Sequence, residues 1–158
     1  MKKTLFLLLI IITHYGCKKE VTPDFSVKII PENRLGVETY AFKEGDSLFF
    51  KFTLSNQSGK DAKYDQPCLQ YVPYLKVYKQ VSYGVYEYIG QPYIVCPAIL
   101  IIKPIKNDST VLLRTFPWSE ELGCPELKAG KYYVGDTFTM DINNKSYDFN
   151  KRIYFDIY

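Results

Sequence analysis

The sequence predicts an all-β protein, built as an antiparallel β-sandwich of about seven to nine strands. Short apolar runs alternate with polar residues at a period of two, and turn-forming residues separate these runs at regular spacing. No long stretch has the periodicity of an amphipathic helix. Aromatic residues make up 16% of the chain, a composition that suits half-buried positions in sheets.

The first predicted strands lie before residue 55. Phe25 to Ile29 alternates apolar with polar side chains, and Val37 to Phe42 predicts a second, shorter strand. The clearest alternation follows after a turn at residues 43–46 and ends at the turn-rich residues 55–59. Its predicted inward side chains are Leu48, Phe50, Phe52 and Leu54.

The remaining strands are predicted as a short single strand, two hairpins and a closing pair. Turn-forming residues mark the hairpin turns at residues 82–84 and 106–109, and a third turn at residues 143–145. The predicted strands are Ala62 to Tyr64, Tyr71 to Gln80, Val85 to Ile89, Ala98 to Ile102, Val111 to Phe116, Tyr132 to Met140 and Arg152 to Ile157.

The N-terminus has the layout of a signal peptide. Lys2 and Lys3 precede an apolar run from Leu5 to Ile12. This run is far shorter than the roughly 20 residues that a spanning helix needs. We therefore expect residues 1–16 to be a leader, residues 17–24 a tether and residues 25–158 a single domain.

Gly16-Cys17 resembles the lipobox of bacterial lipoproteins, although His14 and Tyr15 replace the usual leucine and small residue. The resemblance implies that Cys17 carries acyl chains such as palmitate and attaches the protein to a membrane. The alternative is plain secretion with an incidental cysteine. The charged residues 18–20 resemble the starts of Bacteroidetes lipoproteins, which implies a place in the bacterial cell envelope: the outer membrane, at its periplasmic face or the cell surface.

Charge and histidine content exclude several functions. The formal charge is +3, and loss of Lys2 and Lys3 with the leader reduces it to +1. Basic residues are not clustered, so no nucleic-acid partner is expected. His14 is the only histidine and would be lost with the leader. Without imidazole, the Ser-His and Cys-His catalytic arrangements and histidine-containing zinc sites are excluded. We expect no enzyme, no cofactor and no bound metal.

Residues 127–134 resemble the Leu-x-x-Gly-x-Tyr entry to the penultimate strand of immunoglobulin-like and fibronectin-like domains. The resemblance implies that Tyr132 is a tyrosine corner, whose hydroxyl bonds back to the preceding residues. The layout of residues 48–133 also resembles the immunoglobulin-like fold of the intracellular proteinase inhibitors of bacilli. Trp118, within that layout, is expected to be a buried plug beneath the corner.

Three cysteines remain once Cys17 is assigned to lipid. An exported protein can form disulfides, and an odd number predicts one bridge and one free thiol. Cys68 and Cys96 flank the central hairpin, so a local Cys68–Cys96 bridge is favoured. Cys124 is the alternative partner of Cys96, because the two spacings are equal.

Tyrosines are dense between residues 71 and 93. If Leu75 and Val77 face the core, then the tyrosines at alternate positions face outward and align across the hairpin. Tyrosine offers a large rigid contact with a polar tip, which suits protein interfaces and sugar platforms. The alternative is simple cross-strand pairing. The candidate binding residues are Tyr74, Tyr78, Tyr86 and Tyr88.

These observations predict an envelope lipoprotein that acts as a non-catalytic binding or structural module, with a protein or a glycan of the envelope as its partner. The alternative is an inhibitor of a hydrolase, a protease or lysozyme, acting through residues 82–84 or 117–121. Asn56-Gln57-Ser58 also fits the pattern for N-linked glycosylation, a modification that is uncommon in bacteria.

Overall fold

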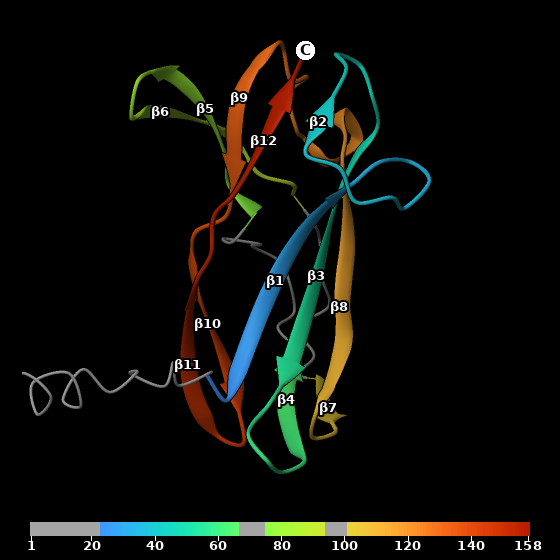
Figure 1. The fold of residues 1–158 in the computed structure, drawn as a ribbon, viewed down its shortest axis with the longest axis vertical. Helices are drawn as coiled ribbons and strands as arrows, with labels where there is room; N and C mark the ends of the chain where they lie inside the picture. Colours follow the sequence, from blue (N-terminus) through green and yellow to red (C-terminus); the bar gives the residue numbers. More distant parts are fainter. Residues whose placement is uncertain (1–22, 67–74, 94–100) are drawn as a thin grey trace, which may run out of the picture.

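The computed structural model describes residues 23–66, 75–93 and 101–158, and these form an almost entirely β structure (Figure 1). The described residues include twelve strands and the short 3-10 turn η2, at Glu120–Leu122. The strands are β1 (Phe25–Glu32), β2 (Ala41–Phe42), β3 (Leu48–Asn56), β4 (Ala62–Gln66), β5 (Val77–Ser82), β6 (Val85–Gly90), β7 (Ile101–Ile105), β8 (Ser109–Trp118), β9 (Gly130–Val134), β10 (Thr137–Ile142), β11 (Lys145–Asn150) and β12 (Ile153–Ile157).

The strands form three sheets around one apolar core. Their orders are β1-β3-β8, β11-β10-β4-β7 and β2-β12-β9-β5-β6, and every strand pair is antiparallel except β2 with β12. The predicted inward residues of β3, from Leu48 to Leu54, are all buried in this core. Side chains of all three sheets contribute to the core cluster. The predicted all-β sandwich is therefore confirmed, with more strands than the sequence predicts.

The extra strands arise from one long hairpin that is broken in the middle. β9 pairs with β12 and β10 pairs with β11 in the same register, so residues 130–157 fold back on themselves around Asn143 and Asn144. Both asparagines have positive φ (52° and 61°), as a two-residue hairpin turn of type I′ requires. The break lies at Gly135 and Asp136, which separates β9 from β10.

The predicted pairing of the second hairpin is wrong. The strands there are β7 and β8, but β7 pairs with β4 and β8 pairs with β3. The chain between them therefore passes from one sheet to another. The pairing of β3 with β8 brings Phe52 against Phe116, with ring centroids 5.7 Å apart in an edge arrangement. Burial of these apolar faces outweighs the local hairpin signal of the turn.

Asn56 ends β3 with a fully buried amide. Its Nδ2 donates to the carbonyls of Lys60 (2.8 Å), Lys106 (3.2 Å) and Ile105 (3.3 Å). Its Oδ1 accepts from the backbone N–H (3.0 Å) and the hydroxyl (2.7 Å) of Ser58. Asn56 thus joins the β3–β4 turn to the end of β7, and its amide nitrogen is not accessible as a glycan acceptor in the folded protein.

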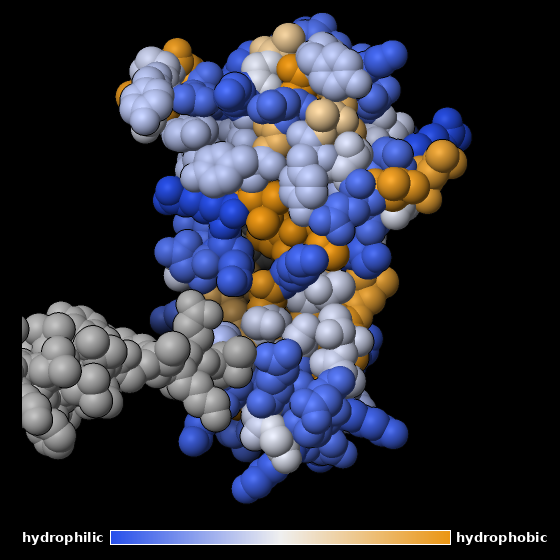
Figure 2. Space-filling model, viewed as in Figure 1, coloured by the Kyte–Doolittle hydropathy of each residue, from blue (hydrophilic) through white to orange (hydrophobic). Residues whose placement is uncertain are grey.

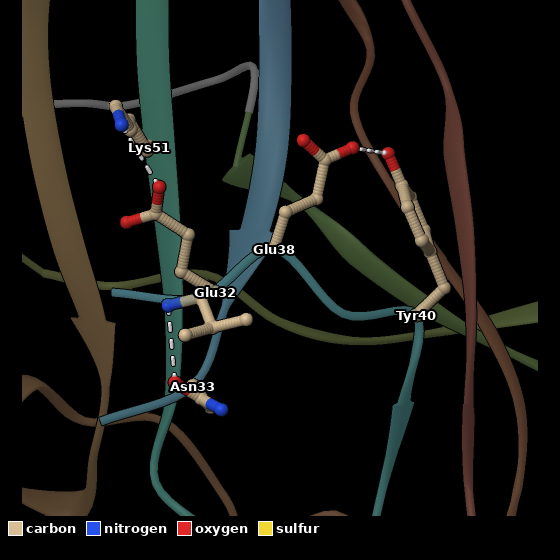
Figure 3. A network of polar contacts seen from close by, with 6 residues as sticks. Glu32, Asn33, Glu38, Tyr40 and Lys51 are labelled. Atoms are coloured by element: carbon tan, nitrogen blue, oxygen red, sulfur yellow. Dashed lines mark hydrogen bonds and ion pairs between the residues drawn. The ribbon is translucent and has the colours of Figure 1, made fainter. Parts of the chain in front are cut away.

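A polar network holds the connection between β1 and β2 (Figure 3). The buried Glu32 accepts from Lys51 Nζ at 2.9 Å across the β1–β3 pair. Asn33 Oδ1 accepts from the backbone N–H of Val37 at 3.1 Å. Tyr40 donates its hydroxyl to Glu38, and this hydrogen bond raises the pKa of the Tyr40 phenol. Side chains therefore order the connection that leads from β1 to β2, a strand of only two residues.

Tyr132 makes the contact that the tyrosine-corner resemblance implies. Its hydroxyl donates to the carbonyl of Lys128, four residues upstream, at 2.5 Å. Its buried ring stacks on Phe155 of the neighbouring β12, with centroids 5.5 Å apart. The side chain therefore ties the chain before β9 to the core of the sheet.

Replacing Tyr132 by phenylalanine is expected to lower the free energy of unfolding by about 1 kcal/mol. The ring and its packing stay, but the Lys128 carbonyl loses its hydrogen bond. Urea unfolding of the two proteins measures the difference. An unchanged midpoint would show that the hydroxyl contributes nothing to stability.

Within the described ranges, no helix is long and apolar enough to cross a membrane. The predicted leader, Cys17 and most of the tether lie outside those ranges. Figure 2 shows that hydrophilic residues cover most of the face that carries β1 and β12, and that apolar residues reach the surface at mid-height.

Candidate binding surface

A row of tyrosines crosses the outer face of the sheet β2-β12-β9-β5-β6. The strand registers pair Tyr88 of β6 with Tyr78 of β5, Tyr78 with Tyr133 of β9, and Tyr133 with Tyr154 of β12. Tyr86 lies on β6 opposite Gln80, one step along the same face. We call these five tyrosines, Tyr78, Tyr86, Tyr88, Tyr133 and Tyr154, the tyrosine platform.

The rings of the platform are in mutual contact. Tyr78 stacks on Tyr133 with centroids 4.7 Å apart and an interplanar angle of 17°. Tyr86 meets Tyr133 edge-on at 4.8 Å, and Tyr88 meets Tyr78 edge-on at 5.6 Å. Tyr154 lies 5.8 Å from Tyr133 and 6.3 Å from Tyr86. Such contacts hold aromatic rings in fixed relative positions.

Exposure divides the platform into a support and a contact surface. Tyr133 is only 7% exposed, because the other rings lie around it. Tyr88 and Tyr154, at the two ends of the row, are 49% and 56% exposed. Tyr78 and Tyr86 are half-buried between them. A partner would therefore meet the outer rings, while Tyr133 supports them.

Charged groups lie beside the phenol groups of the platform. Lys76 Nζ donates to Asp136 Oδ2 at 2.7 Å, which lowers the pKa of the Asp136 carboxyl. Burial raises the pKa of Tyr133, and the nearby positive charge of Arg152 opposes this rise. The guanidinium of Arg152 lies over the Tyr133 ring, 5.0 Å from its centroid. The surface thus combines aromatic faces with charged hydrogen-bonding groups.

The β5–β6 hairpin ends in an exposed apolar tip. Figure 1 shows this hairpin projecting from the body of the molecule, and Figure 2 shows apolar residues at its end. Tyr83 in the turn is 100% exposed, and Val81 and Val85 beside it are 56% and 53% exposed. Gly84 has a φ of 73°, a conformation that favours glycine in this turn. The tip carries no charged side chain from Val81 to Val85.

The sequence-predicted binding residues come together in part. Tyr78, Tyr86 and Tyr88 lie side by side on the platform, whereas Tyr74 lies outside the described residues. Sequence reasoning missed Tyr133 and Tyr154, which come from the last hairpin. The alternation of side chains along a strand could have identified them. Because Tyr132 and Phe155 face inward, their neighbours Tyr133 and Tyr154 must face outward.

The structure describes one of the three predicted domain cysteines. Cys124 is a buried free thiol, and burial raises its pKa to about 11. Cys68 and Cys96 lie outside the described residues, so the Cys68–Cys96 bridge stays a prediction.

Cys124 is expected to resist alkylation in the folded protein. At pH 8.5 a thiol with a pKa of about 11 holds roughly a hundredfold less thiolate than one near 9, and thiolate is the reactive form. Iodoacetamide labelling followed by peptide mapping should show slow modification of Cys124 in buffer and rapid modification in urea. Equal rates in the two conditions would contradict the burial of this thiol.

Trp118 differs from its predicted role. It is half-buried at the end of β8 and not a fully buried plug. Its Nε1 donates to the carbonyl of Pro125 at 2.8 Å, and its ring meets Phe50 edge-on at 6.4 Å. Trp118 lines an open depression of about 220 Å³ together with Cys124 and Glu120. The ring packs against the core, and its N–H is satisfied by a backbone carbonyl.

Comparisons with known proteins give no family. No family model matches the chain, and no curated protein matches it. Among solved structures, Northeast Structural Genomics Consortium target SoR45 is 10% identical, with a TM-score of 0.44 over 87% of this chain and 89% of that one. A β-glucosidase from Listeria innocua in complex with glucose is 13% identical, with a TM-score of 0.38 over 84% of this chain and 16% of the glucosidase. These distant likenesses assign no function to the chain.

Proposed function

We propose that the protein is a lipid-anchored envelope module that binds a partner, without catalysis, through the tyrosine platform. The observation that carries this proposal is the continuous contact of five tyrosine rings across four strands. Exposed aromatic rings held rigidly lose little conformational entropy on binding. Cross-strand pairing alone accounts for neighbouring pairs, but not for the exposed rings at both ends of the row.

The position of the platform is favourable for an anchored protein. Figure 1 shows that β1 begins near the lower end of the molecule, whereas the sheet with β5, β6, β9 and β12 extends to the upper end. Cys17 precedes β1 by a short tether. Lipid on Cys17 would therefore hold the lower end at the membrane and present the platform away from it.

Lipid attachment has its own test. The wild-type chain, expressed in a bacterial host with a fatty-acid probe, should become labelled and stay with membranes. Cys17→Ser should lose both the label and the membrane association. A secreted, unlabelled wild-type protein would overturn the anchor and would leave the platform proposal to be tested separately.

The platform is tested by recovery of partners from envelope extract with the mature chain carrying Cys17→Ser. The protein with an unchanged platform should recover one protein or glycan, and the double variant Tyr78→Ala, Tyr86→Ala should not recover it. Because Tyr78 stacks on the buried Tyr133, its loss could also disturb the sheet. A second variant, Tyr88→Ala with Tyr154→Ala, therefore removes only the more exposed rings.

The matched control is Ile102→Ala with Leu112→Ala. These side chains are both 56% exposed and lie on β7 and β8, in the other two sheets. The control should recover the partner as the wild type does. Unchanged recovery by both tyrosine variants would overturn the platform as the binding surface.

The apolar hairpin tip favours a second candidate function, inhibition of an envelope hydrolase. A projecting loop with a fully exposed Tyr83 between Val81 and Val85 has the shape to enter an apolar cleft. Inhibition of a protease and lysozyme panel by excess protein, lost in Tyr83→Ser, would support it. Full activity of every enzyme in the panel would count against it.

A further inference from the structure

We propose that the tyrosine platform binds a carboxylate-bearing glycan, whose sugar rings stack on the exposed tyrosines and whose carboxylate pairs with Arg152. This inference rests on the proposed function and names its ligand class. It follows from the row of rings and from the guanidinium of Arg152 beside them.

The rings provide stacking surfaces in a row. Adjacent strands are about 4.8 Å apart, so the four-strand row from Tyr88 to Tyr154 is roughly 14 Å long. A sugar ring has an apolar face of C–H groups and a rim of hydroxyls. The apolar face fits an exposed tyrosine ring, and the rim fits phenol hydroxyls and charged groups beside it. A chain of sugars laid along the row would meet both kinds of group repeatedly.

Arg152 supplies the preference for an acidic ligand. Its side chain is held against Tyr133 by the cation–π contact. Arg152 is exposed at the edge of the platform, and within the described part of the chain its guanidinium forms no ion pair, although its charge helps to lower the pKa of Asp136. A guanidinium presents its N–H groups in a plane that matches a carboxylate, so an unpaired one beside sugar-stacking rings favours a uronate-like sugar.

Two other cations of this face lie near acidic residues. Lys76 is paired with Asp136, and Lys131 lies opposite Asp156 in the β9–β12 pair. Arg152 is the cation of this face whose guanidinium lies over a ring of the platform, so it is placed to meet a ligand there. One guanidinium over the rings suits a ligand whose binding depends on rings and one carboxylate, and it does not suit a polyanion such as nucleic acid.

The test compares oligogalacturonate with its methyl ester, measured by calorimetry on the mature Cys17→Ser chain. The two ligands share the sugar rings, and the ester lacks the negative charge. A polyglutamate of similar length carries carboxylates without rings. We expect binding of oligogalacturonate, about tenfold weaker binding of the ester, and no detectable binding of polyglutamate.

Variants separate the two contacts. Arg152→Gln should weaken oligogalacturonate binding about tenfold and leave the ester unaffected, whereas Tyr154→Ala should weaken both. Lys151→Gln is the matched control, because it removes an exposed cation at the neighbouring position, and it should bind as the wild type does. Far-ultraviolet circular dichroism and the unfolding midpoint establish that each variant is folded.

The outcomes decide between this inference and the proposed function. Equal binding of acid and ester, equal binding of polyglutamate, or an unchanged affinity in Arg152→Gln would overturn the acidic glycan. If no glycan binds but the envelope partner is still lost in the tyrosine variants, the ligand class is wrong and the proposed function stands. If envelope recovery is also insensitive to the tyrosines, both fail.

Discussion

Replacing Gly135 by alanine is expected to lower the free energy of unfolding by about 3 kcal/mol or more, the largest effect that a single methyl group should have in this protein. Gly135 has a φ of 129°, where residues with a side chain are strained. A Cβ there would lie 1.9 Å from the carbonyl oxygen of Lys151, which lies between β11 and β12 on the other arm of the hairpin. The oxygen is a backbone atom and the Cβ is fixed directly to the backbone at the break of the long hairpin, so neither can move without disturbing the pairing of β9 with β12.

Gly59→Ala is the matched control for this substitution. Gly59 also has a positive φ, 80°, but a Cβ there meets no atom within 4 Å. Its cost is conformational only, about 1 kcal/mol. Urea unfolding of the three proteins measures both effects. Equal destabilisation by the two substitutions would show that the close approach of Gly135 to Lys151 is not a constraint.

Replacing Asn56 by alanine is the second change with a large expected effect, a loss of about 3 kcal/mol of stability. The variant leaves the buried carbonyl of Ile105 and the part-buried carbonyls of Lys60 and Lys106 without the amide that donates to them. It also releases Ser58 from the Oδ1 of Asn56. Since Asn56 is fully buried and its bond to Ile105 is buried as well, water cannot replace that bond unless the turn opens.

Two further variants show whether the hydrogen bonds are responsible. Asn56→Asp retains an acceptor for Ser58 but cannot donate to the three carbonyls, so it should be destabilised as well. Gln57→Ala alters the exposed neighbouring residue and should shift the unfolding free energy by less than about 0.5 kcal/mol. A stable Asn56→Ala protein would mean that the turn is held by other contacts.

The fold class and the strongest strand were predictable because burial repeats every second residue. The segment from Leu48 to Leu54 has an apolar side chain at every second position, and all four side chains predicted to face inward are buried. β11 was not predicted, because Phe149 is its only fully buried side chain and the alternation is too weak to recognise. The break at Gly135 could not be predicted either, since the backbone conformation there depends on its close approach to Lys151.

Strand partners were less predictable than strands. The turn at residues 106–109 suggested a local hairpin, but the chain crosses to another sheet, and β3 takes β8 as its partner. Contacts such as Phe52 with Phe116 join residues far apart in the sequence, and no local pattern encodes them. The buried Asn56 links to residues 105 and 106 in the same way.

The candidate binding surface was half predictable. The density of tyrosines pointed to Tyr78, Tyr86 and Tyr88, which the β5–β6 register brings together. Tyr133 and Tyr154 joined them only through the pairing of β5 with β9 and of β9 with β12. Arg152 had no sequence signal at all, because its role depends on the ring of Tyr133 beneath it.

The central claim, that the tyrosine platform is the surface that meets a partner, is tested most directly by crosslinking in cells. A photoreactive phenylalanine derivative would replace Tyr88 on the platform or, as control, the similarly exposed Leu112 on β8. We predict a discrete crosslinked product from position 88 that is absent from position 112. Crosslinking from position 112 and none from position 88 would contradict the account.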